Sequence, residues 1–252
     1  MLAHHVALPL CDVRFGWEEN RNYRTLFRYA EGHLDRFPVL TDELLAEVVN
    51  KHTGICTSRR ISHVFIMDVP SYPKPLFITD AAVNIFPTLE DKIDIVQNAI
   101  ELAQALRIDR PKVAILSAVE TITSRIPSTI DAAALCKMAD RGQVTAGVLD
   151  GPLALDNVIN RDAAIIKHIS SPFAGDADIL LVPDLEAGNM LAKELIFLAD
   201  ADAAGIVLGA RVPIILTCRA DNVRNRMASC AVAALYAHAR RVAVLGIGKL
   251  TD

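Results

Sequence analysis

The sequence predicts a layered α/β protein whose sheet is covered by helices on both faces. Short, almost wholly apolar segments rich in Val and Ile recur along the chain, and helical patterns alternate with them. The composition agrees, because 52% of the residues are apolar and only 5% are aromatic. Continuous apolar strands suit a sheet without a polar face. With 252 residues, the chain can form one large domain or two smaller ones.

The expected strands begin after residue 60 and are four to nine residues long. A Pro-Ser-Tyr-Pro turn at 70–73 separates the first two. The apolar runs that predict strands are Ile61–Val69, Leu76–Thr79, Val113–Leu116, Val144–Leu149, Asp178–Val182, Gly205–Leu208 and Pro213–Leu216.

The expected helices follow recognisable start signals. Thr88 and Asp91 stand three residues apart in the pattern of a capping box, so a helix should begin directly after Thr88. Ser128 and Asp131 repeat the pattern, and that helix should stop near Gly142. Both segments show apolar residues at helical spacing.

A last helix is expected from about Asn222 to Ala239. Its apolar residues recur every three or four positions, which predicts one buried stripe. The expected stripe consists of Val223, Met227, Cys230, Ala231, Ala234 and Leu235.

The first 40 residues differ from the rest of the chain. They hold six of the thirteen aromatic residues and show no clean period. Regular patterning starts at Thr41, with Leu44, Leu45, Val48 and Val49 on one helical face. Residues 1–40 are therefore interpreted as an atypical N-terminal arm.

Charge, hydropathy and cysteine content exclude several classes of protein. The net charge is −4 and no long basic stretch offers a field for a phosphate backbone, so a nucleic-acid partner is not expected. No apolar run reaches the roughly 18 residues of a membrane span, and a secretory signal is not expected, since no basic segment followed by an apolar core stands at the N-terminus. The five cysteines are scattered and odd in number, which favours a reduced, cytoplasmic compartment.

The motifs of several common enzyme classes are missing. The sequence contains no P-loop, no dinucleotide-binding G-x-G-x-x-G and no G-x-S-x-G nucleophile elbow. It also contains neither H-E-x-x-H nor C-x-x-C, so no metal site is expected.

Polar residues gather instead where predicted strands lead into helices, which is where ligands bind in open α/β sheets. Arg219 lies in such a place and can hold a phosphate by two parallel hydrogen bonds, or it can be a solvated loop charge. Asp184 and Asp221 can contact a ligand or simply cap helices. The three junctions are Phe77–Thr88, Ser171–Asn189 and Pro213–Asp221.

These junctions closely resemble the phosphate acetyl/butyryltransferase family. The most specific match is Ser-Pro-x-Ala-Gly-x-Ala-x-x-Leu-x-x-Pro-Asp-x-x-Ala-Gly-Asn at Ser171–Asn189. The resemblance runs from about Thr41 to Arg241. The Ser171–Asn189 motif together with Ile61–Phe86 is most similar to the branch whose members can carry a fused enoyl-CoA hydratase domain, and nothing here resembles that domain. The other matching segments are Ile78–Thr88, Asp150–Asp156 and Leu216–Asp221.

The resemblance implies a two-domain, three-layer fold of the isocitrate/isopropylmalate dehydrogenase type. Residues 61–207 would form one domain, and residues 1–60 together with 208–252 the other. The implied protein is a homodimer whose substrates are an acyl-CoA and inorganic phosphate. It would convert acetyl-CoA and phosphate reversibly into CoA and acetyl phosphate, with no cofactor beyond the coenzyme A thioester.

The resemblance also implies site residues. The family's catalytic Ser-Arg pair falls on Cys218 and Arg219. Asp221 is the nearest carboxylate for the assisting aspartate, although strict counting lands near Asn225. The residues expected to bind substrate are Asp80, Asn84, Asp150, Asp184, Gly188 and Asn189.

Two departures from the family are visible. Cys218 replaces the family serine, and a thiol is a weaker hydrogen-bond donor than a hydroxyl. Gly32–Leu40 stands where the family has a Lys-Gly loop, and the arm before it does not resemble the family. The domain that includes residues 1–60 is therefore expected to be atypical or incomplete.

Three alternatives to the acetyltransferase remain open at the level of the sequence. They are a phosphate butyryltransferase, a catalytically impaired family member, and an NAD-dependent decarboxylating dehydrogenase of the same fold. The dehydrogenase would need an aspartate cluster and an arginine-rich substrate segment, and neither can be placed. The length of the acyl chain depends on packing and is not fixed by the sequence.

Overall fold

The computed structural model describes residues 55–217 and 221–244. The helices and strands in these ranges belong to one compact unit that begins at Cys56. The aromatic-rich arm and the helical face expected from Thr41 lie outside the described residues.

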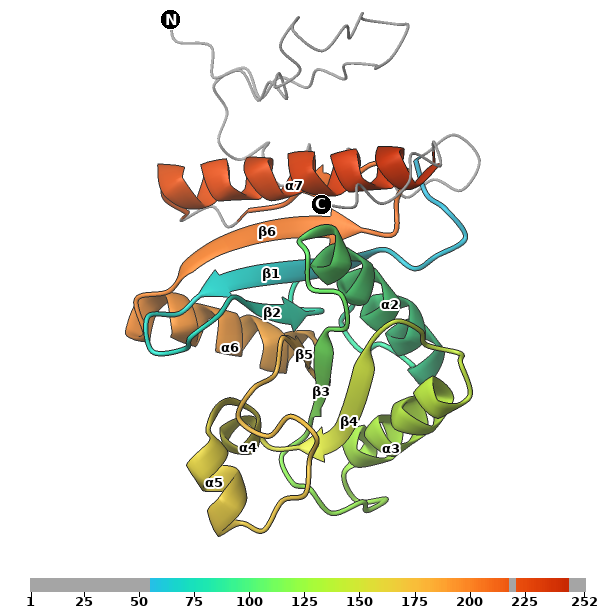
Figure 1. Cartoon of the computed structure of the whole chain (residues 1–252), viewed down its shortest axis with the longest axis vertical. Coiled ribbons are helices and arrows are strands. Elements are labelled where there is room, and N and C mark those ends of the chain that lie inside the picture. The colour runs from blue at the N-terminus through green and yellow to red at the C-terminus, as the bar shows by residue number, and fades with distance from the viewer. Residues whose placement is uncertain (1–54, 218–220, 245–252) are drawn as a thin grey trace, which may run out of the picture. The chain divides into compact units, whose positions relative to one another are not determined.

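One mixed sheet of seven strands organises this unit, in the order β4-β3-β5-β2-β1-β6-β7 (Figure 1). The four strands β4, β3, β5 and β2 are parallel, β1 is antiparallel to both β2 and β6, and β7 is antiparallel to β6. The strands are β1 (Ser62–Asp68), β2 (Leu76–Thr79), β3 (Lys112–Leu116), β4 (Val148–Leu153), β5 (Ile179–Leu181), β6 (Asp202–Leu208) and β7 (Ile214–Ile215).

Helices cover both faces of the sheet, as the composition of the strands predicts (Figure 1). One face packs against α2, α3 and α7, while the other packs against α4 and α6. No helix within the described ranges is long and apolar enough to cross a membrane. The helices are α2 (Leu89–Ala105), α3 (Pro127–Asp140), α4 (Leu155–Ile159), α5 (Arg161–Ile166), α6 (Leu185–Leu198) and α7 (Val223–Val244).

The core consists of two apolar clusters, one on each side of the sheet. Successive strand residues point to opposite faces, so Ile179 and Leu181 of β5 join the α2 side and Leu180 joins the α6 side. These three side chains are buried almost completely. The strands are apolar on both faces because each face of the sheet packs against a layer of helices.

Local signals predicted β2 and α2 correctly. β2 spans Leu76–Thr79 as expected. At the start of α2, the Thr88 hydroxyl accepts from the Asp91 N–H at 3.2 Å, and the Asp91 carboxylate accepts from the Thr88 N–H at 3.0 Å. The expected capping box is confirmed.

The second expected capping box is wrong. α3 begins at Pro127, and its N-cap Ile126 makes no side-chain cap. The Ser128 hydroxyl lies 2.9 Å from the hydroxyl of Ser117, and Asp131 forms an ion pair with Lys92 at 2.6 Å. Tertiary partners therefore take both side chains away from the helix end.

The fourth strand lies later than expected. The structure places β4 at Val148–Leu153 rather than Val144–Leu149. β4 is an edge strand, so one side of its backbone needs no partner, and Pro152 can be part of it.

The buried stripe expected on α7 is also wrong. Val223, Met227 and Leu235 are 76%, 59% and 54% exposed, whereas Asn225 and Ser229 are buried. The short β7 pairs only with the end of β6, so earlier N–H groups of β6 need other partners. The Asn225 amide oxygen accepts from the N–H of residue 203 at 3.2 Å, and the Ser229 hydroxyl accepts from that of residue 205 at 2.9 Å. Polar side chains thus determine which face of α7 is turned inward.

Candidate active site

A cavity of about 370 Å³ lies between α6 and the segment after β7, and residues of β1 form part of its wall. One part of its wall is apolar and the other carries amide, hydroxyl and charged groups. The residues that line it are His63, Phe65, Ala82, Asn189, Ala192, Lys193, Ile196, Phe197, Leu216, Thr217, Asp221, Asn222 and Asn225.

α6 presents Asn189 and Lys193 to this cavity. The two residues are four positions apart, so they share one face of the helix. The Asn189 amide donates to the carbonyl of Ala81 at 3.2 Å, which ties α6 to the turn after β2. Within the described ranges, Lys193 has no ion-pair partner, so its ammonium group is available to an anion.

Two expected site residues set the position of α6. The Asp184 carboxylate accepts from the Ala187 N–H at 2.9 Å and caps the helix. At Gly188, a Cβ atom would lie 2.7 Å from a methyl carbon of Val182 and 3.0 Å from the Cβ of Ala81. Only glycine permits this close approach between α6 and the sheet. A direct contact of Asp184 or Gly188 with substrate stays a prediction.

Asp80 and Asn84 build the turn that carries Ala82 into the cavity wall. The buried Asp80 carboxylate accepts from the backbone N–H groups of residues 82–84 and from the Asn84 amide. The Asn84 amide also donates to the carbonyl of Ile61 at 2.9 Å, and its oxygen accepts from Arg60 at 2.7 Å. The internal partners of Asp80 and Asn84 support a positioning role, and their binding of substrate stays a prediction.

The opposite wall is formed by Thr217 and Asp221, which flank the expected catalytic pair. Cys218 and Arg219 themselves lie outside the described residues. Asp221 and Asn225 both line the cavity, but Asn225 carries an amide and only Asp221 carries a carboxylate. Asp221 is accordingly the better candidate for the assisting carboxylate.

Asp150 lies apart from this cavity. It belongs to the edge strand β4, and its carboxylate accepts from the N–H of Gly151 at 2.9 Å. The structure therefore brings Asn189 and Asp221 together at one cavity, while Asp150 is not among the residues that line it.

Sequence reasoning missed His63 and Lys193. A signal existed for both: His63 is a titratable residue next to the apolar run 64–67, and Lys193 follows Asn189 by one helical turn. His63 is fully buried, and this burial lowers its pKa, although the charge of Asp80 partly offsets the effect. The ring is therefore neutral at neutral pH.

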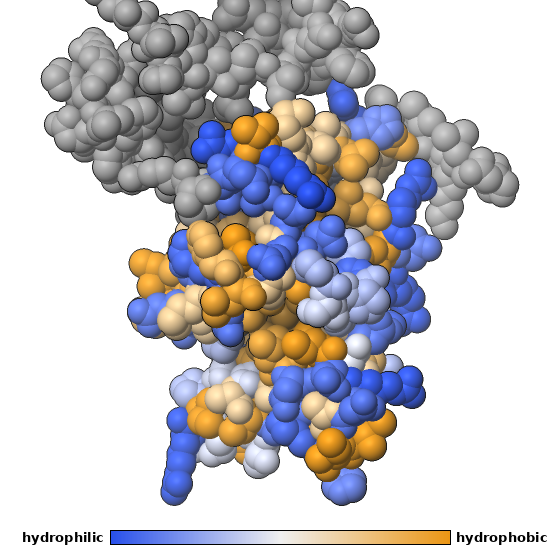
Figure 2. Space-filling model, turned by 90° about the vertical axis from the view of Figure 1, so that its left-hand side faces the viewer, coloured by the Kyte–Doolittle hydropathy of each residue, from blue (hydrophilic) through white to orange (hydrophobic). Residues whose placement is uncertain are grey.

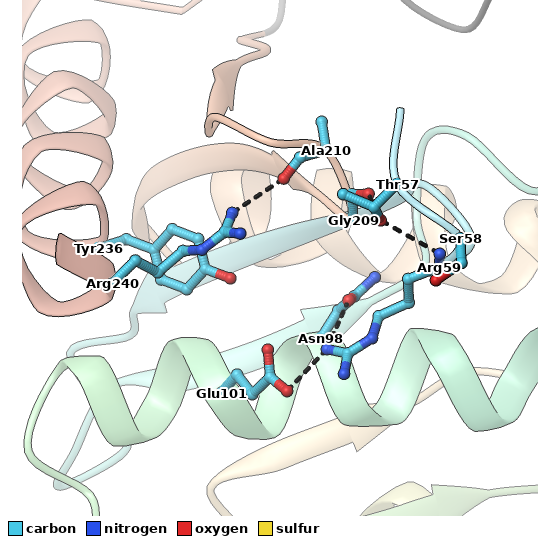
Figure 3. Close-up of a pocket in the computed structure, with 9 residues that line it drawn as sticks. All are labelled: Thr57, Ser58, Arg59, Asn98, Glu101, Gly209, Ala210, Tyr236 and Arg240. Carbon is cyan, nitrogen blue, oxygen red and sulfur yellow. Dashed lines mark hydrogen bonds and ion pairs between the residues drawn. The ribbon is translucent and has the colours of Figure 1, made fainter. Parts of the chain in front are cut away.

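A second hollow of about 260 Å³ lies at the far end of β6, between α2 and α7 (Figure 3). The Arg59 guanidinium forms an ion pair with Glu101 at 2.7 Å, and Arg240 donates to the carbonyl of Ala210 at 2.9 Å. Both cations in its wall thus bind protein groups. Four segments of the chain meet at this hollow, and it does not resemble the polar cavity beside α6.

Apolar side chains are exposed on α6 and α7. Figure 2 shows apolar surface gathered in the middle of one side of the molecule. Such surface is typical of contacts with another chain or with another part of the same chain. The largest exposed apolar residues on the two helices are Met190, Phe197, Leu198, Val223, Met227 and Leu235.

A polar cavity beside a capped helix, next to the turn that follows the parallel strand β2, is a candidate small-molecule site of an α/β protein. A sequence profile of the phosphate acetyl/butaryl transferase family matches residues 39–234. The chain belongs to this family.

Curated relatives carry names from both branches of the family. The chain is 70% identical over 203 residues to a phosphate acetyltransferase of Rhizobium meliloti, covering 81% of this chain and 64% of that protein. It is 60% identical over 211 residues to one of Rickettsia felis, covering 83% of this chain and 60% of the other. A phosphate butyryltransferase of Clostridium acetobutylicum is 45% identical over 199 residues, covering 79% and 66%. The chain thus spans about three fifths of the first two relatives.

Solved structures of the family share the fold. A branched-chain phosphotransacylase from Enterococcus faecalis superimposes with a TM-score of 0.73 at 35% identity, covering 79% of this chain and 71% of that one. A phosphotransacetylase from Streptococcus pyogenes gives 0.63 at 25% identity, with 80% and 65% covered.

Proposed function

We propose that the protein transfers an acyl group between coenzyme A and inorganic phosphate, with acetyl as the acyl group. The observation that carries the proposal is the cavity beside α6. It joins the end of the Ser171–Asn189 motif to the two residues, Thr217 and Asp221, that flank Cys218 and Arg219. Acetyl is placed before butyryl because the 70% identical relative is named a phosphate acetyltransferase.

The proposed reaction is a direct transfer in a ternary complex. An oxygen of phosphate attacks the thioester carbonyl carbon, the C–S bond breaks, and CoA leaves as a thiolate that takes up a proton. Arg219 neutralises the phosphate and the charge that develops on the carbonyl oxygen. Asp221 orients phosphate or accepts its proton as a general base.

Further residues contribute to holding the substrates. Cys218 occupies the sequence position of the family serine, where a hydroxyl or thiol donates a hydrogen bond to the carbonyl oxygen or the departing sulfur. Lys193 supplies a positive charge for an anionic group of either substrate. Because no covalent enzyme intermediate is needed, much of the rate comes from proximity and electrostatics.

The proposal includes the whole-protein properties that the family implies. These are a two-domain fold of the isocitrate/isopropylmalate dehydrogenase type, a homodimer and a cytoplasmic location. The exposed apolar residues of α6 and α7 support a partner surface. Asp80, Asn84, Asp150, Asp184, Gly188 and Asn189 remain proposed contributors to substrate binding.

A phosphate-dependent assay of CoA release tests the function. Acetyl-CoA, butyryl-CoA and longer thioesters are supplied to this chain and to the same chain extended upstream by a family-like N-terminal segment. From the extended protein we expect phosphate-dependent release that is fastest with acetyl-CoA. A folded, extended protein that releases no CoA from any thioester would overturn the proposal.

A further inference from the structure

His63 is the fully buried titratable group that the proposed mechanism leaves without a task. It lies on β1 and forms part of the wall of the cavity beside α6. Its ring packs edge-on against Phe65 at a centroid distance of 4.3 Å. Its carbonyl accepts from the Thr79 hydroxyl at 2.9 Å. Ring and backbone are therefore both held in place.

The two ring nitrogens have different surroundings. Nε2 lies 3.4 Å from the carbonyl oxygen of Leu216, which can only accept a hydrogen bond. In the neutral ring the proton therefore belongs on Nε2, and Nδ1 keeps a lone pair. This Nδ1 is buried and has no hydrogen-bond partner among the described residues.

The fold makes room for this arrangement at Gly205 of β6. A Cβ atom there would lie 3.0 Å from Nε2 of His63 and 2.3 Å from the Leu216 carbonyl oxygen. A glycine in the middle of a buried strand is costly, so its presence indicates that the close approach matters.

We propose that His63 is a substrate-binding residue whose Nδ1 accepts a hydrogen bond from an amide N–H of the pantetheine arm of coenzyme A. A buried acceptor without a partner is unfavourable. Nδ1 has almost no accessible surface, so the atoms that cover it must move on binding, and an amide N–H that takes their place satisfies this acceptor. Phosphate oxygens are mainly acceptors and do not meet this need, whereas the pantetheine arm carries amide N–H groups. The apolar lining residues Phe65, Ile196 and Leu216 suit its methylene groups. This inference rests on the proposed function.

Two isosteric variants separate binding from a merely structural role. In His63→Asn the amide reaches the position of Nδ1 and can accept, while in His63→Gln it reaches the position of Nε2 and can donate to Leu216. CoA is titrated calorimetrically into the 252-residue chain and both variants, and thermal unfolding is recorded. We expect CoA to bind about tenfold more weakly to His63→Gln, whereas His63→Asn keeps most of the affinity.

If His63 only anchors Leu216 through Nε2, His63→Gln should bind CoA more tightly than His63→Asn. That result would overturn the inference. Equal CoA affinities in the wild type and His63→Gln would overturn it too, while the proposed function would stand. If CoA binds neither to the wild-type chain nor to the chain extended upstream by a family-like segment, the inference and the proposed function both fail.

A second measurement does not depend on the folding of His63→Asn. In the wild type labelled with nitrogen-15 histidine, the Nδ1 resonance that is missing in His63→Gln should move on addition of CoA. An unchanged Nδ1 resonance at saturating CoA would contradict the contact.

Discussion

At the scale of single residues, Arg219 carries the sharpest prediction. If it binds phosphate, Arg219→Ala raises the KM for phosphate and lowers kcat by about 100- to 1,000-fold, because a charge-stabilising donor is lost. Arg224→Ala is the matched control, since Arg224 is exposed and forms an ion pair with Asp202 at 2.9 Å. Steady-state kinetics on both variants of the upstream-extended chain measure the difference, and equal, small effects would remove Arg219 from the site.

The thiol of Cys218 gives a second prediction. If it faces the reacting groups, Cys218→Ser keeps or raises activity, and alkylating reagents inactivate the wild type but not the serine variant. Substrate should slow this inactivation. Cys136 should react little with the alkylating reagent, because burial raises its pKa to about 12 and keeps the thiol protonated. Mass spectrometry locates the label, and labelling of Cys218 only after unfolding would show that it fills a core.

At the scale of elements, Gly188 sets the distance between α6 and the sheet. In Gly188→Ala the new methyl group must displace Val182 or Ala81, so we expect a loss of about 1–3 kcal/mol in the free energy of unfolding. CoA affinity should fall as well, because Asn189 moves with the helix. Denaturant unfolding compares this variant with Glu194→Ala, an exposed change on α6 that should have little effect.

An ion-pair cluster joins the starts of three strands and makes stability depend on pH. The Asp176 carboxylate binds the ammonium groups of Lys112 and Lys74, and these hydrogen bonds lower its pKa from the usual 3.8. A lowered carboxyl pKa stabilises the fold above the unfolded value, and this stabilisation is lost as the pH falls below about 4.

Asp176→Asn should therefore cost about 0.2–1 kcal/mol near pH 7, since the carboxylate is half-exposed, and progressively less in acid. Unfolding titrations at pH 7 and pH 3 measure the change. The control Asp140→Asn lies in an exposed pair with Lys137 and should alter stability little. A cost for Asp176→Asn that does not shrink in acid would contradict the assignment.

The sequence predicted those elements whose signals are local. β2 is one uninterrupted apolar run, and α2 starts at a cap that needs only Thr88 and Asp91. The orientation of α7 depends instead on the N–H groups of β6, which Asn225 and Ser229 satisfy. Periodicity alone cannot reveal that polar requirement.

The candidate site likewise combines residues that local sequence signals identify with residues that only the fold brings there. Asn189 and Asp221 belong to recognisable junctions and were expected at the site, and both line one cavity. His63 reaches that cavity only because β1, β2 and β6 are paired in a particular register. Such a juxtaposition follows from the sheet and not from spacing along the chain.

At the scale of the whole molecule, the prediction concerns what precedes Thr41. The chain spans about three fifths of its first two relatives, and residues 1–40 do not resemble the family. If family-like strands are missing there, one wall of the cleft is incomplete and apolar surface is left open. We therefore expect the 252-residue form to be a dimer or larger, with weak or undetectable transferase activity. An upstream, family-like segment should restore phosphate-dependent release of CoA. Light scattering and the CoA-release assay test both parts, and robust activity of the 252-residue form would show that its own N-terminal arm completes the site.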